Sequence, residues 1–293
     1  MRYLALLATF SSLRVLAAQT PPPSPIPAND HAPIYRITVV QRALQAVNFE
    51  RHAGPTEIDL KGTVLLPKAE GRATVEVKNG YTKVDLNLRK IAPPTQFGNE
   101  FLTYVLWAIT PDGKAINLGQ VIPGGSDKAS MHVTSPNSTF GLLVTAEPYF
   151  SVPYPSDVVI LESAARPETI GRREAVEAKY ELLPRGQYTL NIQASQLASA
   201  NMQKQPSVSM EQYEAVTTLY QARNAIQIAR ADGADKTGTD TLAKAQKYLD
   251  QAEAAYTQKN YKSMTDSARQ AVEAASDART IAMRQKSAPG SRQ

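Results

Sequence analysis

The sequence ATVEVKNGYTKVDLNL, residues 73–88, decides the fold of the first half of the chain. Apolar and polar side chains alternate on both sides of Asn79-Gly80, which is the pattern of a strand with one buried face. Asn-Gly supplies the two positive-φ residues that a tight hairpin turn requires. The stretch therefore predicts two antiparallel strands joined by a two-residue turn.

Similar β patterns lie on both sides of this hairpin. Residues 35–39 and 58–64 alternate with the same period, whereas 102–109 is almost continuously apolar, as in a strand buried on both faces. Shorter β-prone runs complete the set: 129–133, 140–146, 158–161, 178–183 and 187–192. The segment 174–183 also fits a short helix. Many short strands between turns indicate a sandwich or a barrel, and we predict an antiparallel, immunoglobulin-like β-sandwich.

After Pro206 the apolar period changes from two residues to about three and a half. Three runs have this spacing: Ala215, Leu219, Ala222, Ile226 and Ala229; Leu242, Ala245, Leu249, Ala252 and Tyr256; Met264, Ala268, Ala271, Ala275, Ala278 and Ala282. We expect the first helix to end at Asp232-Gly233 and Thr239 or Asp240 to cap the second. The short link at 259–260 favours antiparallel neighbours, so the second half is predicted to be a three-helix antiparallel bundle.

The N-terminus indicates export. A basic start, an apolar stretch at 3–10 and small residues at 17–18 are typical of a secretory signal peptide, with a plain N-terminal helix as the alternative. The proline-dense stretch that follows favours an extended linker. The predicted organisation is a signal peptide at 1–18, a proline-rich linker at 19–33, a β-sandwich domain at 34–193, a linker at 194–207, a helical bundle at 208–285 and a disordered tail at 286–293.

Composition argues against several classes of function. The net charge is +5, from 32 basic and 27 acidic residues that are interspersed, so the clustered positive charge of a nucleic-acid interface is missing. The absence of cysteine excludes thiolate nucleophiles and cysteine zinc sites, and the three histidines lack metal-ligand spacing. No later stretch has the length of a transmembrane span. We predict no cofactor, no metal, no catalytic residue and no enzyme activity, with a hydrolase using dispersed acidic residues as a minor alternative.

Two sets of residues are candidate partner contacts. Tyr149, Phe150 and Tyr154 lie in a proline-punctuated loop after a predicted strand, and loop aromatics frequently contact sugars, peptides or proteins. Tyr149 and Phe150 could instead fold back and plug one end of the sandwich. Arg223 and Arg230 lie seven residues apart beside an apolar stripe, where they could bind an anion or pair with acids at the core edge.

The chain resembles a family of exported bacterial envelope proteins. The resemblance in the helical half covers 220–226, 229–234, 245–253, 260–261 and 268–282, a repeat classed as a domain of unknown function. The β half, notably 101–108 and 145–150, is similar to the N-terminal part of larger proteins in which both halves precede a coiled coil and a peptidoglycan-binding module of the outer-membrane-protein-A family. The similar residues include no such module, so direct contact with peptidoglycan is left open.

These observations lead to one expectation about function. We expect a non-catalytic structural or adaptor protein in the periplasm or at the outer membrane, whose partners are envelope proteins or cell-wall-associated components. A soluble glycan- or peptide-binding module that uses the aromatic, proline-rich loop is the alternative.

Overall fold

The computed structural model describes residues 42–50, 54–123, 127–164, 172–178 and 209–287. All of them belong to one compact unit, Ile37–Gln293. The predicted strands at 35–39 and 187–192 lie outside the described residues, as do the signal peptide, both linkers and most of the tail.

The hairpin predicted from residues 73–88 is confirmed. Strand β3 (Glu70–Lys78) pairs with β4 (Tyr81–Arg89), and Lys78 lies opposite Tyr81 across the turn. Gly80 has a φ of 87°, which a residue with a side chain rarely adopts. Val84, Leu86 and Leu88 are buried while their neighbours along the strand are more exposed, so the alternation identifies the buried face correctly.

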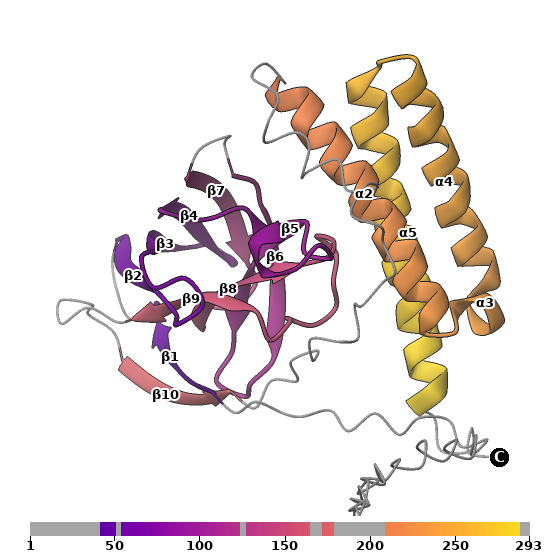
Figure 1. The fold of residues 1–293 in the computed structure, drawn as a ribbon. Coiled ribbons are helices and arrows are strands. Elements are labelled where there is room, and N and C mark those ends of the chain that lie inside the picture. Colours follow the sequence, from indigo (N-terminus) through magenta and orange to yellow (C-terminus); the bar gives the residue numbers. More distant parts are fainter. Residues whose placement is uncertain (1–41, 51–53, 124–126, 165–171, 179–208, 288–293) are drawn as a thin grey trace, which may run out of the picture. The chain divides into compact units, whose positions relative to one another are not determined.

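Eight strands form a nearly closed, barrel-like antiparallel sheet. Besides β3 and β4, which are already described, the strands are β1 (Arg42–Asn48), β2 (Thr56–Gly62), β5 (Thr103–Ile109), β6 (Ala115–Val121), β7 (Lys128–Ser135), β8 (Thr139–Glu147), β9 (Val159–Ala164) and β10 (Arg172–Ala178). Hydrogen-bonded ladders connect β6, β5, β8, β9, β2, β3, β4 and β7 in that order. Strands β6 and β7 meet at the remaining seam, where Gly119 lies beside Met131 and Val133. Strands β1 and β10 extend from β8 (Figure 1).

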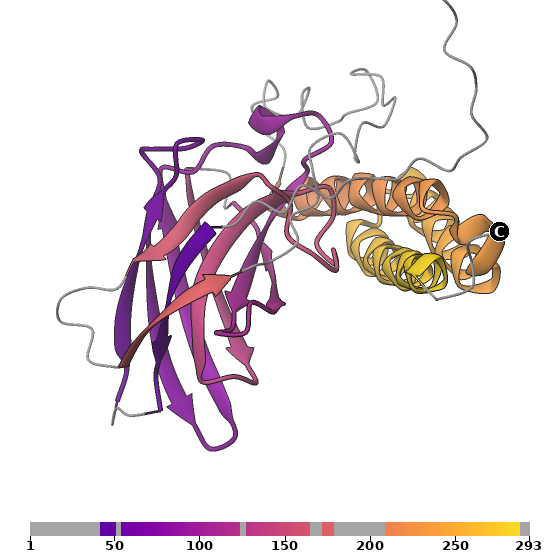
Figure 2. The same cartoon turned by 90° about the horizontal axis from the view of Figure 1, so that it is seen from below.

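The prediction of an immunoglobulin-like sandwich is therefore wrong. In a sandwich the strands divide into two sheets that share no hydrogen bonds, whereas here the ladders β5–β8, β8–β9 and β9–β2 lie on one continuous path. Register shifts at Leu106/Trp107 and Val144/Thr145 help the sheet to curve, since such irregularities bend and twist a strand (Figure 2). Side-chain alternation is the same in a sandwich and a barrel, so it does not distinguish them.

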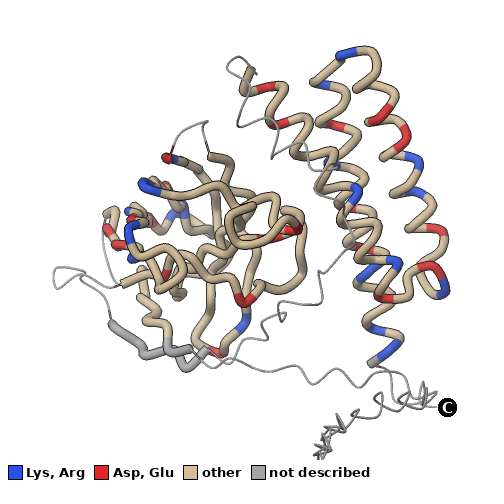
Figure 3. The backbone as a smooth tube through the Cα atoms, in the orientation of Figure 1, with Lys and Arg blue, Asp and Glu red and all other residues tan. Residues whose placement is uncertain are grey.

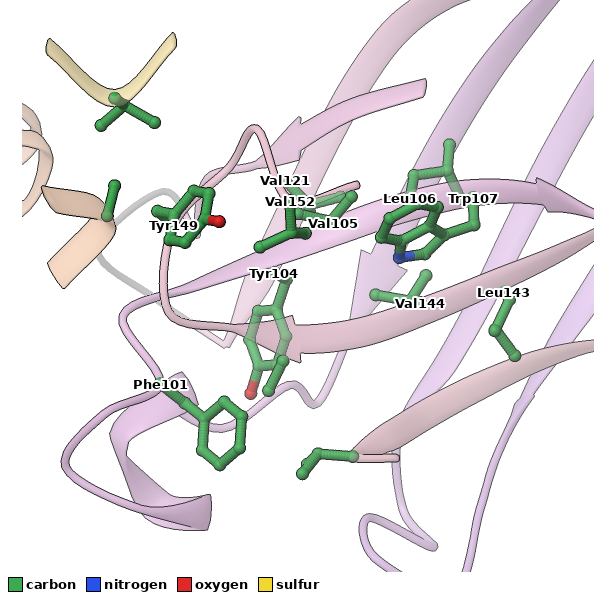
Figure 4. Packing of buried hydrophobic residues seen from close by; sticks show 14 of the residues in the cluster. Phe101, Tyr104, Val105, Leu106, Trp107, Val121, Leu143, Val144, Tyr149 and Val152 are labelled. Atoms are coloured by element: carbon green, nitrogen blue, oxygen red, sulfur yellow. The ribbon is translucent and has the colours of Figure 1, made fainter. Parts of the chain in front are cut away.

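Strand β5 runs through the centre of the apolar core. All seven of its residues are buried, as the continuous apolar run predicts. Leu106 of β5 lies opposite Val144 of β8, and Figure 4 shows both in the core. The hydroxyl of Tyr104 donates to the carbonyl of Ala92, so this aromatic residue is satisfied although it is fully buried.

The second half contains the three predicted long helices. They are α2 (Met210–Ala231), α4 (Thr239–Thr257) and α5 (Tyr261–Ser287), with the short α3 (Ala234–Thr237) between the first two. Helix α5 packs against both α2 and α4, and the helices lie side by side in Figures 1 and 2. The predicted alanine ladder of α5 is buried throughout, which permits close helix approach.

The helix ends are only partly as predicted. Gly233 follows α2 with a φ of 91°, as expected for a helix terminator. Thr239 and Asp240 do not cap α4, because Gly238 holds the N-cap position without a side-chain hydrogen bond. A Cβ atom on Gly238 would lie 3.0 Å from the carbonyl oxygen of Ala278, so glycine permits close contact with α5 here.

Leu249→Ala is expected to lower the free energy of unfolding by about 2–5 kcal/mol, since a buried leucine would leave a cavity beside small residues. Tyr256→Ala, at a residue that is 49% exposed on the same helix, is the matched control and should change stability far less. Urea unfolding followed by circular dichroism measures both. Equal losses for the two variants would contradict the packing of α4 described above.

Candidate functional site

The loop at residues 148–155 follows β8 and contains the three aromatic candidates. Tyr149 is 0% exposed, Phe150 is partly buried, and Tyr154 is 41% exposed. Tyr149 lies beside Val152 at the edge of the core in Figure 4. The structure thus buries Tyr149, partly buries Phe150 and leaves Tyr154 accessible to solvent.

A buried arginine connects Tyr149 to two helices. Arg279 of α5 is 2% exposed, and its Nη1 donates to the Tyr149 hydroxyl at 3.0 Å. Its Nε donates to Oδ2 of Asp232, which follows α2, at 2.6 Å. Burial raises the pKa of Tyr149, so the hydroxyl stays protonated at neutral pH. The contact series from Tyr149 through Arg279 to Asp232 joins the loop to both helices.

The rest of the loop tip makes further polar contacts with the helices. The Phe150 amide donates to Oε1 of Gln221 in α2 at 2.9 Å, and its ring lies 5.2 Å from the guanidinium of Arg269 in α5. The hydroxyl of Ser276 in α5 donates to the carbonyl of Ser151. We call these contacts, together with those of Tyr149 and Arg279, the joint.

Residues outside the loop reinforce the joint. Asn224 of α2 donates to the carbonyl of Glu100 at 3.2 Å. Arg269 donates to Glu214 in α2 at 3.1 Å and to Gln120 in β6 at 3.4 Å. The described contacts between barrel and helices therefore include many hydrogen bonds, and they involve α2 and α5.

The carboxyl of Glu147 holds the base of the loop. Its Oε1 accepts from the amide of Ser156 at 2.7 Å and from the hydroxyl of Thr145, which in turn accepts from the indole nitrogen of Trp107 at 2.8 Å. The Ser156 hydroxyl donates to the carbonyl of Ala146 at 2.7 Å. These bonds connect the two ends of the loop, because Glu147 precedes it and Ser156 follows it.

Glu147 is fully buried, and burial raises its pKa to about 8. Hydrogen bonds from Ser156 and Thr145 and the charge of Arg279 act in the opposite direction but do not overcome the desolvation. Oε2 has no hydrogen-bond partner among the described residues. The carboxyl is therefore mostly protonated at pH 7, an unusual state for a glutamate.

The two candidate arginines are paired within the helical region. Arg223 donates to Glu253 of α4 at 2.9 Å and lies over the ring of Tyr220. Arg230 donates to Gln246 of α4 at 2.9 Å. Both arginines thus connect α2 to α4, and neither is brought together with Tyr149 or Phe150 by a described contact.

Sequence reasoning missed the residues that complete the joint. A glutamate at the end of the apolar run 140–147 was a signal, since a charged residue in such a run requires partners. Arg279 was a second signal, because it lies four residues after Ala275 beside the predicted ladder. Asp232 was considered only as part of a helix terminator.

A shallow polar groove lies between two hairpin turns. It encloses about 460 Å³ and is lined by Thr110, Pro111, Asp112, Lys114, Pro136, Asn137, Ser138 and Thr139. Much of its hydrogen-bonding capacity is used locally: the Thr110 hydroxyl donates to Asp112, which lowers the pKa of that carboxyl, and Ser138 donates to Glu50. The groove is thus a weaker candidate than the joint for a specific role.

Charged residues of both signs are scattered along β3, β4 and β7 (Figure 3), at positions that are exposed or partly buried. Asp85 accepts from Lys83 at 2.8 Å and lies 2.6 Å from Nδ1 of His132, and the bond from Lys83 is the largest cause of its lowered pKa. Within the described ranges, no three histidine or acidic side chains gather as metal ligands would.

Comparison of the chain with known protein families and with curated proteins finds no match. The resemblance to exported envelope proteins therefore stays a prediction. Among the described helices, none combines the length and apolar character that crossing a membrane requires.

Glu147→Gln is expected to remove a pH dependence of stability. A carboxyl with a raised pKa in the folded state stabilises the fold most below its unfolded pKa of about 4.5, and this stability is lost as pH rises to about 8. The wild-type free energy of unfolding should fall by up to about 1.4 kcal/mol per pH unit in that window. Urea unfolding at pH 5.5, 7 and 8.5 measures the slope, and the exposed Glu57→Gln should retain it.

Arg279→Met is expected to lower the free energy of unfolding by about 2–3 kcal/mol, because the buried Tyr149 hydroxyl loses its donor and Asp232 loses its charged partner. Arg230→Met, which removes an exposed guanidinium bonded to Gln246, should stay within about 0.5 kcal/mol of wild type. Thermal and urea unfolding of both variants check the difference. A small loss for Arg279→Met would mean that the joint adds little stability.

Proposed function

We propose that this protein is a non-catalytic structural or adaptor protein of the cell envelope that acts through protein–protein contacts. Its export rests on the N-terminal sequence alone. One observation supports the adaptor role. Helices α2 and α5 contact the barrel through the joint, whereas α4 packs on these two helices through one face and leaves its other face exposed.

The exposed side of α4 and its C-terminal end form the surface we propose for partners. The buried side of this helix consists of Leu242, Ala245, Leu249, Ala252 and Ala255. Its other side includes Lys244, Lys247 and Gln251 in exposed positions. Tyr256 continues the buried stripe at the C-terminal end of the helix, where its ring is 49% exposed. An exposed tyrosine is typical of the centre of a protein interface, and polar side chains such as those of the open face of α4 are typical of its rim.

The alternative of a glycan- or peptide-binding loop has less support. Tyr149 and Phe150 make contacts in the joint, which leaves Tyr154 as the exposed aromatic residue of the loop. Sugar recognition by stacking would then depend on a single tyrosine.

Site-specific photocrosslinking in the cells that make the protein tests the proposal. A benzoylphenylalanine replaces Tyr256 on α4, Tyr154 on the loop, or Tyr81 on β4, all of which are exposed. We expect the Tyr256 position to give a discrete adduct with an envelope protein, which an excess of the unmodified full chain competes away. Tyr81 is the matched control and should give none.

Three results would contradict the adaptor role at α4. They are adducts at Tyr154 alone, equal adducts at all three positions, and recovery of the full-length chain from the cytosol rather than the envelope. The first result would favour the loop as the binding surface.

A further inference from the structure

The loop at 148–155 is held separately at its base and at its tip. At the base, Glu147 and Ala146 of β8 bond to Ser156. At the tip, Tyr149, Phe150 and Ser151 bond to α2 and α5. The hydrogen bonds at the base thus hold the loop in the conformation in which its tip contacts the helices.

Two buried polar atoms near the joint lack partners among the described residues. One is Oε2 of Glu147, and the other is Nε2 of Gln221, whose Oε1 receives the Phe150 amide. Buried polar groups in folded proteins are almost always hydrogen-bonded, and an unsatisfied one destabilises the state that buries it. Hydration of both atoms on separation would therefore favour opening of the joint.

The charged and titratable groups around Glu147 come from several elements. Arg279 projects from α5, Tyr149 from the loop tip, and Asp232 follows α2, while the half-buried Asp157 follows Ser156. Arg279 is the cation among them, and it already bonds to Tyr149 and Asp232. The carboxyl of Glu147 receives no described hydrogen bond from it.

We infer that the joint is a pH-dependent latch, in which the cost of burying an ionised Glu147 carboxyl favours exposure of the base of loop 148–155 to water and release of α2 and α5 from the barrel. The closed joint keeps the carboxyl neutral, and the open joint lets water reach it. Opening releases one proton to solvent between pH 4.5 and about 8, so a rise in pH within this window favours the open state.

The size of the effect follows from proton linkage. Burial places the pKa of Glu147 at about 8 in the closed state, against 4.5 for a hydrated carboxyl. Between these values the ratio of open to closed molecules increases by up to about tenfold for each pH unit, and above the upper value it levels off. The response therefore lies in the range from pH 5 to 8.5.

A distance measurement on the full chain tests the latch. The sequence contains no cysteine, so Ser130→Cys on β7 and Gln251→Cys on α4 give two unique, exposed sites for a donor and an acceptor fluorophore. We expect energy transfer to fall as pH rises from 5 to 8.5, while circular dichroism shows that strands and helices persist.

The same labelled chain with Glu147→Gln should keep constant transfer across this range, and Glu57→Gln should follow the unsubstituted chain. Transfer that is independent of pH in the unsubstituted chain would overturn the latch even if Glu147→Gln failed to fold. So would a decline that survives Glu147→Gln, or one that accompanies loss of the circular dichroism signal, because the latter reports global unfolding.

Discussion

The burial of one neutral carboxyl is the constraint on which the attachment of the helices depends. Glu147 ends β8 inside the fold, where an isolated charge would be strongly unfavourable, and its oxygen is occupied by Ser156 and Thr145. Ser156 lies at the far end of loop 148–155. The hydrogen bond from its amide to Glu147 therefore brings the two ends of the loop together. The closed loop then brings Tyr149 to Arg279.

The contacts between the barrel and the helices are largely polar. Such contacts fix one relative orientation, and they also permit the two parts to separate. The described contacts use oriented donors and acceptors, such as the guanidinium of Arg279, the amide of Gln221 and the hydroxyl of Ser276. A buried ion pair contributes little net stability once desolvation is included, yet breaking it is destabilising. Polar interfaces of this kind within a chain are generally those that permit relative motion.

The sequence predicted local structure well because that structure follows from short-range constraints. Alternation and Asn79-Gly80 located the β3–β4 hairpin, and the alanine spacing located the buried face of α5. It predicted the wrong closure of the sheet, since the ladders between β8, β9 and β2 depend on contacts between distant residues.

Strand β6 was missed because its side chains are mostly only partly buried and Gly119 interrupts the pattern. The joint was missed for the same reason as the closure: Glu147 and Arg279 are 132 positions apart, and only the fold brings them near each other.

The two readings of the aromatic loop differ in what the aromatic residues contact, and that is a property of the whole fold. Prolines restrict the backbone of the loop and so reduce the entropy lost on contact, whether the contact is a ligand or another part of the chain. Tyr149 has an apolar ring for the core and a hydroxyl for Arg279, which suits an intramolecular joint as well as a binding site. Arg279 of α5 distinguishes the intramolecular joint from a binding site for a ligand. Because Arg279 is itself buried and also bonded to Asp232, the Tyr149 contact is held from both sides, which favours the intramolecular interpretation of the loop.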